Sequence, residues 1–158
     1  MEKALSDLEI QPFVSNILKY NELSGISPEV LMNMLPVAIL YQAGESYGHW
    51  TLLLRTPEGI EFFDPYGIII DKEFKYLEKQ QPHYLAKLLY DLDKSGVVIN
   101  YNPWKFQDMK YGINTCGRWV ILRSLFKDWG IDKFANVVDR VSRQLNLTPD
   151  EFIVQTIA

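Results

Sequence analysis

Two apolar runs on either side of a short turn segment constrain the fold of this chain more than any other feature of its sequence. The runs are HWTLLLR, residues 49–55, and IEFFDPYG, residues 60–67, and the segment TPEG, residues 56–59, separates them. Proline presets φ in a tight turn and glycine tolerates a positive φ, so TPEG is typical of a turn. The pattern predicts a β-hairpin whose second strand ends in a Pro-Gly break.

Helices and further strands are predicted around this hairpin. Residues 1–35 have helical pieces, one of them starting at Ser27 as N-cap with Pro28 in the first helical position. The other expected elements are a buried strand at 37–42, a loop at 43–48, helical structure at 71–92 with a break near Gln81-Pro82, a third strand at 96–102, a loop at 103–114, a buried helix from Cys116 to Trp129 with Gly130 at C′, a helix near 132–144, and a last helix after the start signal at 147–151. The expected fold class is α+β, a small mixed or antiparallel sheet with flanking helices and a central helix that starts at Cys116.

Composition excludes several classes of function. The length of 158 residues fits one domain over 1–158, and no apolar run approaches the roughly 18 residues of a membrane span. The N-terminus carries early acids and does not resemble a signal peptide. The net charge of −4 comes without a basic stripe, which argues against a nucleic-acid partner. The single cysteine cannot form an internal disulfide and fits an intracellular compartment.

That cysteine, Cys116, lies where a reactive thiol is favoured. It begins the apolar stretch CGRWVILRSLF, directly after Asn114 and Thr115, either of which suits an N-cap. The partial positive charge of a helix N-terminus favours a thiolate there. Gly117 lets the backbone approach a substrate closely. The position alone also suits an inert buried cysteine, so the remaining groups of a site decide between the two interpretations.

A cysteine nucleophile needs a base, and the chain has two histidines. His83 lies in a predicted helix, where its position predicts no acidic neighbour, and it is interpreted as a surface or packing residue. His49 opens a strand beside the loop GESYG, where site residues collect. Asp64 closes the second hairpin strand and is the candidate that orients His49, although an Asp-Pro pair also forms turns.

The hairpin register tests whether His49 and Asp64 can meet. A two-residue loop pairs residue 55 with 60, and then 51 with 64. His49 and Asp64 are then diagonal neighbours on one face of the sheet, within side-chain reach. A three-residue loop with a bulge at Gly59 could place them on opposite faces. An oxyanion hole also needs donors, which the Cys116 main chain and a side-chain amide, Gln107 or Asn114, could supply.

These residues resemble the adenain-like cysteine proteases, the maturation proteases of the adenovirus type. The resemblance rests on GHW (48–50), FFDPYG (62–67), a Gln in the following loop, and NTCGRWV (114–120), and it covers residues 36–125. Relatives of this family occur in virophages, in Maverick/Polinton elements and in large DNA viruses. The SUMO and NEDD8 deconjugating proteases belong to the same clan.

The resemblance implies a role for each matching residue. Cys116 would be the nucleophile, His49 the general base and then acid, and Asp64 the residue that orients His49. Trp50 would shield the imidazole and, with Gly117, line a narrow substrate channel. Gln107 would complete the oxyanion hole with the Cys116 main chain; because it lies nine residues before Cys116, farther than is usual in the family, the loop must bulge or Asn114 donates instead.

The implied function is that of an endopeptidase which cuts viral structural precursors, such as capsid proteins, at glycine-containing sites during particle maturation. We expect a monomer without metal or other cofactor. A DNA cofactor does not suit the acidic chain, and a disulfide-linked peptide activator would need a second thiol. No membrane partner is expected, and the location would be the infected cell's cytoplasm or virus factory, with packaging in the virion.

Three alternatives remain open on the sequence. A deconjugating protease for a ubiquitin-like modifier would use the same site but needs a further binding surface. An acetyltransferase with the same Cys-His-acid order would need a basic site for an inositol-phosphate activator. An inactive relative could act as a scaffold, although all the chemical positions are filled.

Overall fold

A five-stranded mixed sheet forms the centre of the protein. The structure is a computed structural model that describes residues 4–42, 48–71, 82–108 and 114–157. The strands follow one another across the sheet in chain order, with β1–β2 and β4–β5 parallel and the two inner pairs antiparallel. They are β1 (Asn16–Lys19), β2 (Val37–Gln42), β3 (Gly48–Thr56), β4 (Gly59–Phe63) and β5 (Ile99–Tyr101). The expected α+β class is therefore confirmed.

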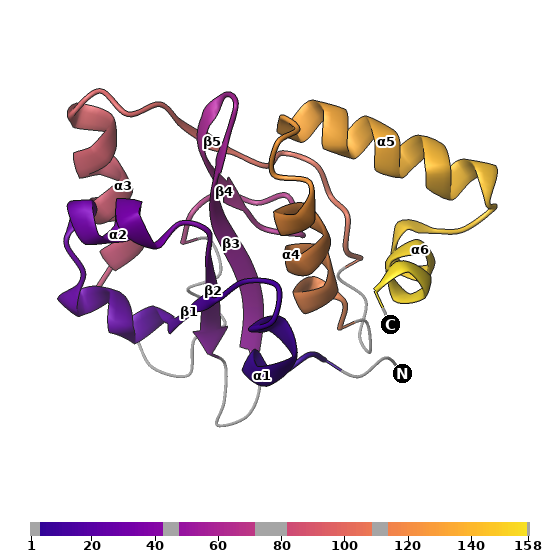
Figure 1. Cartoon of the computed structure of the whole chain (residues 1–158), viewed down its shortest axis with the longest axis horizontal. Coiled ribbons are helices and arrows are strands. Elements are labelled where there is room, and N and C mark those ends of the chain that lie inside the picture. The colour runs from indigo at the N-terminus through magenta and orange to yellow at the C-terminus, as the bar shows by residue number, and fades with distance from the viewer. Residues whose placement is uncertain (1–3, 43–47, 72–81, 109–113, 158) are drawn as a thin grey trace.

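Helices cover both faces of this sheet, as Figure 1 shows. One face carries the 3-10 helix η1 (Tyr20–Gly25), α2 (Pro28–Met34) and α3 (Tyr84–Lys94). The other carries α1 (Asp7–Ile10), α4 (Cys116–Leu125), α5 (Ile131–Gln144) and α6 (Pro149–Thr156). No helix in the described ranges is both long and apolar enough to span a membrane.

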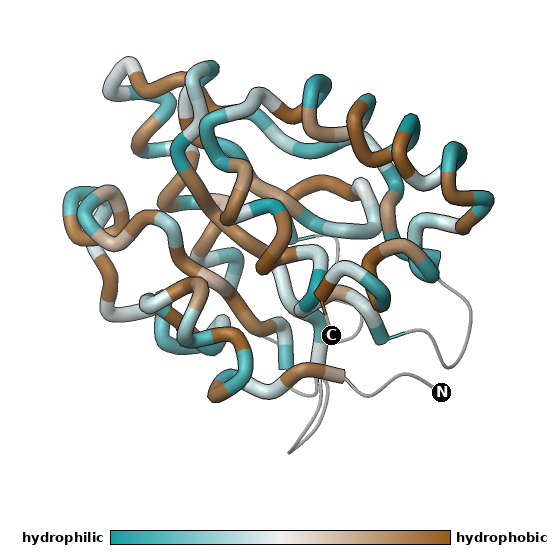
Figure 2. The backbone as a smooth tube through the Cα atoms, turned by 45° about the vertical axis from the view of Figure 1, so that its right-hand side comes forward, coloured by the Kyte–Doolittle hydropathy of each residue, from teal (hydrophilic) through white to brown (hydrophobic). Residues whose placement is uncertain are grey.

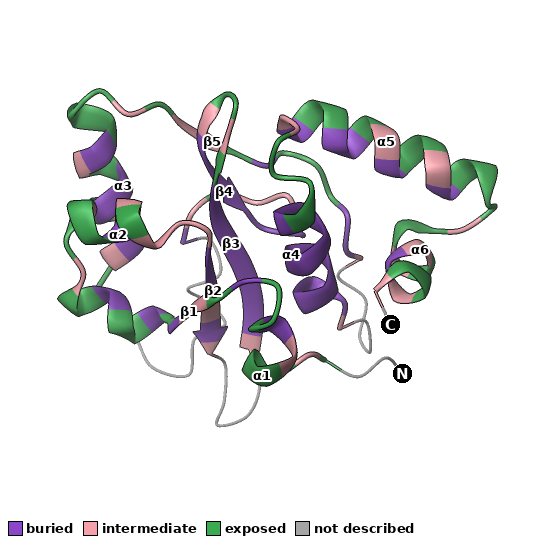
Figure 3. Ribbon diagram, viewed as in Figure 1, coloured by how far each residue is buried: buried purple, intermediate pink, exposed green. Residues whose placement is uncertain are grey.

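Burial on both faces explains the unbroken apolar run of β3. Successive side chains of a strand point to opposite faces, so Leu52 and Leu54 pack toward α4 while Leu53 packs toward α3. Figure 3 shows β3 and most of α4 in the colour of buried residues. In contrast, α5 alternates hydrophilic and hydrophobic along its length in Figure 2, because only one of its sides meets the core.

The hairpin has the register that an even loop requires. Arg55 pairs with Ile60 and Thr56 with Gly59, which leaves a two-residue loop. The Glu58 N–H donates to the Thr56 hydroxyl at 3.1 Å. Gly59 has a φ of 126°, a backbone conformation that would be strained in any residue with a side chain. The N-caps at Ser27 and Thr148, each followed by proline, are also present.

Several predicted boundaries are wrong. Residues 1–35 contain a strand, β1, whose four residues are too few to show a period and pair with β2 over a long separation. The strand predicted at 96–102 spans only Ile99–Tyr101, and the strand predicted at 60–67 ends at Phe63. Of the helical structure expected at 71–92, the described residues show α3, which begins at Tyr84. Residues 72–81 lie outside the described residues. Most of the loop expected at 43–48 and part of the loop expected at 103–114 also lie outside them.

The central helix also ends earlier than predicted. It stops at Leu125, and Gly130 is the N-cap of α5 with a φ of −63°, not a C′ residue of α4. The Arg123 side chain explains the early end, because it donates hydrogen bonds to the main-chain oxygens of Phe126 and Trp129. These bonds satisfy carbonyls just past the helix and fix the chain as it turns toward α5.

Candidate active site

The hairpin brings His49 and Asp64 into contact. Nε2 of His49 lies 2.8 Å from Oδ1 of Asp64, and the Asp64 side chain is fully buried. Leu52 pairs with Phe63, so residue 51 stands opposite 64 and His49 is the diagonal neighbour on the same face. The contact therefore follows from the two-residue loop, as predicted.

The turn after β4 holds Asp64 in place. Oδ1 of Asp64 also accepts the Tyr66 N–H at 2.8 Å, while its main-chain oxygen accepts from the Gly67 N–H and from the Asn102 side chain, each at 2.8 Å. Gly67 has a φ of 74°, and a Cβ there would lie 2.7 Å from the main chain of Trp104. The glycine of FFDPYG is thus required by a close approach of two segments.

Cys116 is the first residue of α4 and its side chain reaches the histidine. The sulfur accepts a hydrogen bond from the Trp50 N–H at 3.5 Å and is also hydrogen-bonded with the His49 side chain. Since Nε2 of His49 faces Asp64, the other ring nitrogen, Nδ1, is left for the thiol. Thr115 occupies the N-cap position, but its hydroxyl donates to Oδ1 of Asp150 at 2.6 Å instead of capping α4.

The charge distribution favours a protonated imidazole. Burial alone would lower the pKa of His49, but the Asp64 carboxylate and its hydrogen bond, together with Cys116, raise the pKa well above its usual value. The Tyr66 ring stacks on the imidazole with centroids 4.5 Å apart and planes inclined by 11°. Stacking and hydrogen bonding together fix the orientation of the ring between the carboxylate and the thiol.

Gln107 lies in the segment that follows β5. Its N–H and that of Phe106 both donate to the main-chain oxygen of Pro65, at 3.0 and 2.9 Å. The glutamine is thereby tied next to Asp64, and its side chain is buried. Asn114 stands two residues before Cys116. The assignment of the oxyanion donor to Gln107 or Asn114 stays a prediction.

Trp50 and Gly117 lie beneath the N-terminal segment. The Trp50 indole N–H donates to the Leu5 main-chain oxygen at 3.0 Å, and a Cβ on Gly117 would lie 3.0 Å from that of Leu5 and 3.3 Å from Ile10. A groove of about 680 Å³ runs beside Trp50 and Gly48. Trp50 therefore packs in the core and lines a groove; the substrate-channel role of both residues stays a prediction.

His83 is remote from this arrangement. It precedes α3, on the other face of the sheet, with its side chain largely exposed and Nδ1 3.3 Å from Asp71. Among the residues that the structure describes, no group of three or more His, Cys, Asp or Glu side chains is placed to hold a metal ion.

Three residues of the site were missed in the sequence. Asn102 anchors the main chain of Asp64, Tyr66 stacks on His49, and Asp150 binds Thr115. Only Tyr66 had a local signal, its place in FFDPYG. Asn102 and Asp150 reach the site from 38 and 35 residues away along the chain, and no spacing indicates such contacts.

Comparison with known proteins links this chain to a virophage. No protein-family model matches it. A protein of Sputnik virophage, described as uncharacterized protein V9, is 35% identical over 146 residues, which cover 87% of this chain and 79% of V9. Identity at this level over most of both chains establishes common descent and a common fold. The chain belongs to the family of the Sputnik virophage protein V9.

Proposed function

We propose that this chain is a cysteine endopeptidase that cuts viral structural precursor proteins. The observation that carries the proposal is the contact between His49 and Asp64 at 2.8 Å, with Cys116 hydrogen-bonded to the same imidazole at the start of a buried helix. A nucleophile, a base within reach and a carboxylate that orients the base are the parts that acyl transfer requires.

The mechanism passes through a thioester. The Cys116 sulfur attacks the peptide carbonyl carbon, and the oxygen that becomes negative is held by the Cys116 N–H and the Gln107 side chain. His49 gives its proton to the leaving amine as the C–N bond breaks. Water, deprotonated by His49, then attacks the thioester, releases the acid product and restores the thiol.

Support for a viral substrate comes from the relation to a virophage protein and from the resemblance to maturation proteases. The groove is lined by Gly48 and Trp50, the two neighbours of His49 in the chain, and gives an extended peptide room to bind near the site. The resemblance favours glycine at the cut site, where small residues fit a narrow channel. A capsid precursor is the substrate that this combination favours.

Alkylation of Cys116 by iodoacetamide across pH tests the site without knowledge of the substrate. Wild-type protein is expected to react rapidly near neutral pH, and His49→Ala to react slowly, because the imidazole no longer stabilises the thiolate. His83→Ala is the matched control and should behave as wild type. A Cys116 that reacts only after unfolding, whether or not His49 is present, would exclude the proposal.

Cleavage itself is tested with capsid precursors. The purified protein, with reductant and without DNA, is incubated with recombinant capsid proteins of the virus that encodes it, and fragments are identified by mass spectrometry. Wild type is expected to release defined fragments and Cys116→Ala none. Cleavage that persists in Cys116→Ala would assign the activity to a contaminant, and dependence on DNA would contradict the cofactor-free mechanism.

A further inference from the structure

Asp150, at the start of α6, joins two segments that the proposed mechanism needs side by side. Its Oδ2 accepts the Asp108 N–H at 2.9 Å, and its Oδ1 accepts the Thr115 hydroxyl at 2.6 Å. Asp108 directly follows Gln107, and Thr115 directly precedes Cys116. One carboxylate therefore connects the residues next to both expected oxyanion donors.

A main-chain hydrogen bond already attaches the Gln107 segment to the turn that follows Asp64. The Gln107 N–H is bonded to the oxygen of Pro65, which follows Asp64. Asp150 adds a second attachment one residue later, and this one leads to the helix that carries the nucleophile. Hydrogen bonds to a carboxylate are shorter and stronger than neutral ones, which suits a contact that fixes a distance.

We infer that Asp150 is a positioning residue of the proposed protease, one that sets the separation between the Gln107 side chain and the Cys116 N–H through its bonds to Asp108 and Thr115. The inference rests on the proposed function. An oxyanion hole works only when both donors lie at hydrogen-bond distance from the same oxygen. A displacement of about 1 Å in such a site can lower the rate by about 10²-fold.

Two reactions of the same thiol separate this role from a structural one. Iodoacetamide reacts by displacement of iodide at a saturated carbon, so no oxyanion forms. With p-nitrophenyl acetate, the Cys116 sulfur bonds to the acetyl carbon, and the ester C–O bond then breaks. The p-nitrophenolate leaves with the electron pair, and an acetyl thioester stays on Cys116. This second reaction passes through an oxyanion, and its rate is measured from the burst of p-nitrophenolate.

Asp150→Ala is expected to lower the acylation rate about 10- to 100-fold while alkylation changes less than about twofold. Asp150→Asn should restore most of the acylation rate, because its amide can accept from the Asp108 N–H and donate to the Thr115 hydroxyl. Glu151→Ala is the matched control: it removes the neighbouring carboxylate of the same helical turn, which accepts from Thr148, and should leave both rates unchanged.

Thr115→Val removes one of the two bonds with little change in side-chain volume, and it keeps the test decisive if Asp150→Ala does not fold. It should slow acylation and leave alkylation unchanged. Equal losses in both reactions, or no loss in acylation, would overturn the positioning role while leaving the protease proposal standing. A wild-type thiol no faster than a denatured one with either reagent would instead remove the proposed function, and with it the role of Asp150.

Discussion

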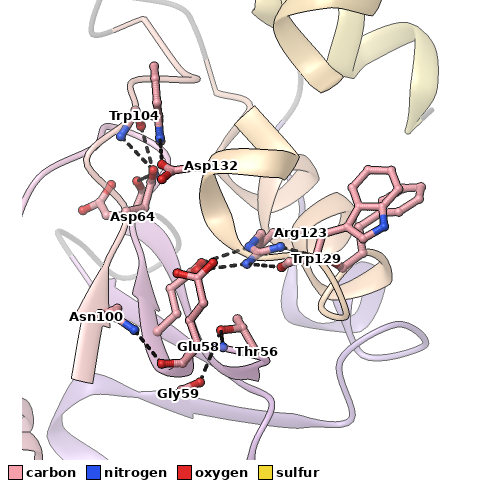
Figure 4. A network of polar contacts seen from close by, with 12 residues as sticks. Thr56, Glu58, Gly59, Asp64, Asn100, Trp104, Arg123, Trp129 and Asp132 are labelled. Atoms are coloured by element: carbon pink, nitrogen blue, oxygen red, sulfur yellow. Dashed lines mark hydrogen bonds and ion pairs between the residues drawn. The ribbon is translucent and has the colours of Figure 1, made fainter. Parts of the chain in front are cut away.

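The two ends of α4 each meet a buried pair of opposite charges, and the pairs are built differently. At its start, Cys116 faces His49 and Asp64; at its end, Arg123 faces Glu61 of β4. Arg123 donates to both carboxylate oxygens of Glu61, at 2.9 and 2.8 Å, and to the carbonyls of Phe126 and Trp129. Figure 4 shows the Arg123 side chain pointing toward the main chain of Trp129. The first pair contacts the Cys116 thiol, whereas Arg123 of the second pair is bonded to two carbonyls and lies over the Phe134 ring, 5.1 Å from its centroid.

The difference shows how one helix and sheet hold an imidazole beside a thiol at one end and a closed ion pair at the other. Burial raises the pKa of Glu61, and Arg123 offsets this only in part. Burial would lower the pKa of His49, and here Asp64 and Cys116 overcome it. The Arg123 pair holds the end of α4 against β4, while the His49 pair keeps a proton beside a thiol.

The largest expected effect comes from breaking the contact between His49 and Asp64, on which the proposed activity depends. Asp64→Asn should lower kcat/KM by about 10³- to 10⁴-fold, because an amide no longer orients His49 or favours its charged form. The unfolding free energy, measured with denaturant, should change far less than the activity. Activity within tenfold of wild type would show that Asp64 is only a turn residue.

Breaking the other pair should affect stability instead. Arg123→Met leaves the Glu61 carboxylate buried without its cation and should lower the unfolding free energy by about 3–5 kcal/mol. At a temperature where the variant is folded, iodoacetamide should alkylate Cys116 at the wild-type rate. A strong loss of thiol reactivity in folded Arg123→Met would mean that the two ends of α4 are not independent.

Replacing both partners of the structural pair sharpens the comparison. Glu61→Leu with Arg123→Met should be more stable than Arg123→Met alone, since no lone charge stays buried. The unfolding free energy should stay below that of wild type, because the carbonyls of Phe126 and Trp129 lose their donor. Denaturant unfolding of the single and double variants measures the difference, and a double variant less stable than the single one would contradict this account.

The smallest expected effect is the pH dependence of stability. His49 has a pKa raised in the folded state, so its contribution to stability is complete below the unfolded pKa. That contribution is lost as pH rises through the raised folded pKa. Wild-type unfolding free energy should therefore fall from neutral to alkaline pH more than that of His49→Gln. Parallel pH profiles for the two proteins would show that the imidazole is not protonated at neutral pH.

The sequence predicted best the features that depend on neighbouring residues. The hairpin, the cap at Ser27 and the start signal at 147–151 follow from turn and cap chemistry. The sequence left the loop length open between two and three residues, and the two-residue loop of the structure places His49 beside Asp64. Strand β1 and the end of α4 were missed because pairing with β2 and the Arg123 contacts decide them. Asp150 could not be found, since only the packing of α6 brings it to Thr115.

The agreement between strand order and chain order has a consequence for folding. Strands β2, β3 and β4 form a meander of sequence-near contacts, which have a low entropy of loop closure. We expect this meander, and with it the imidazole and its carboxylate, to form early. Helix α4 must then dock over a much longer loop. The Cys116 thiol would then meet the His49 imidazole late in folding, so a partly synthesised chain would lack the thiol–imidazole pair that the proposed function needs.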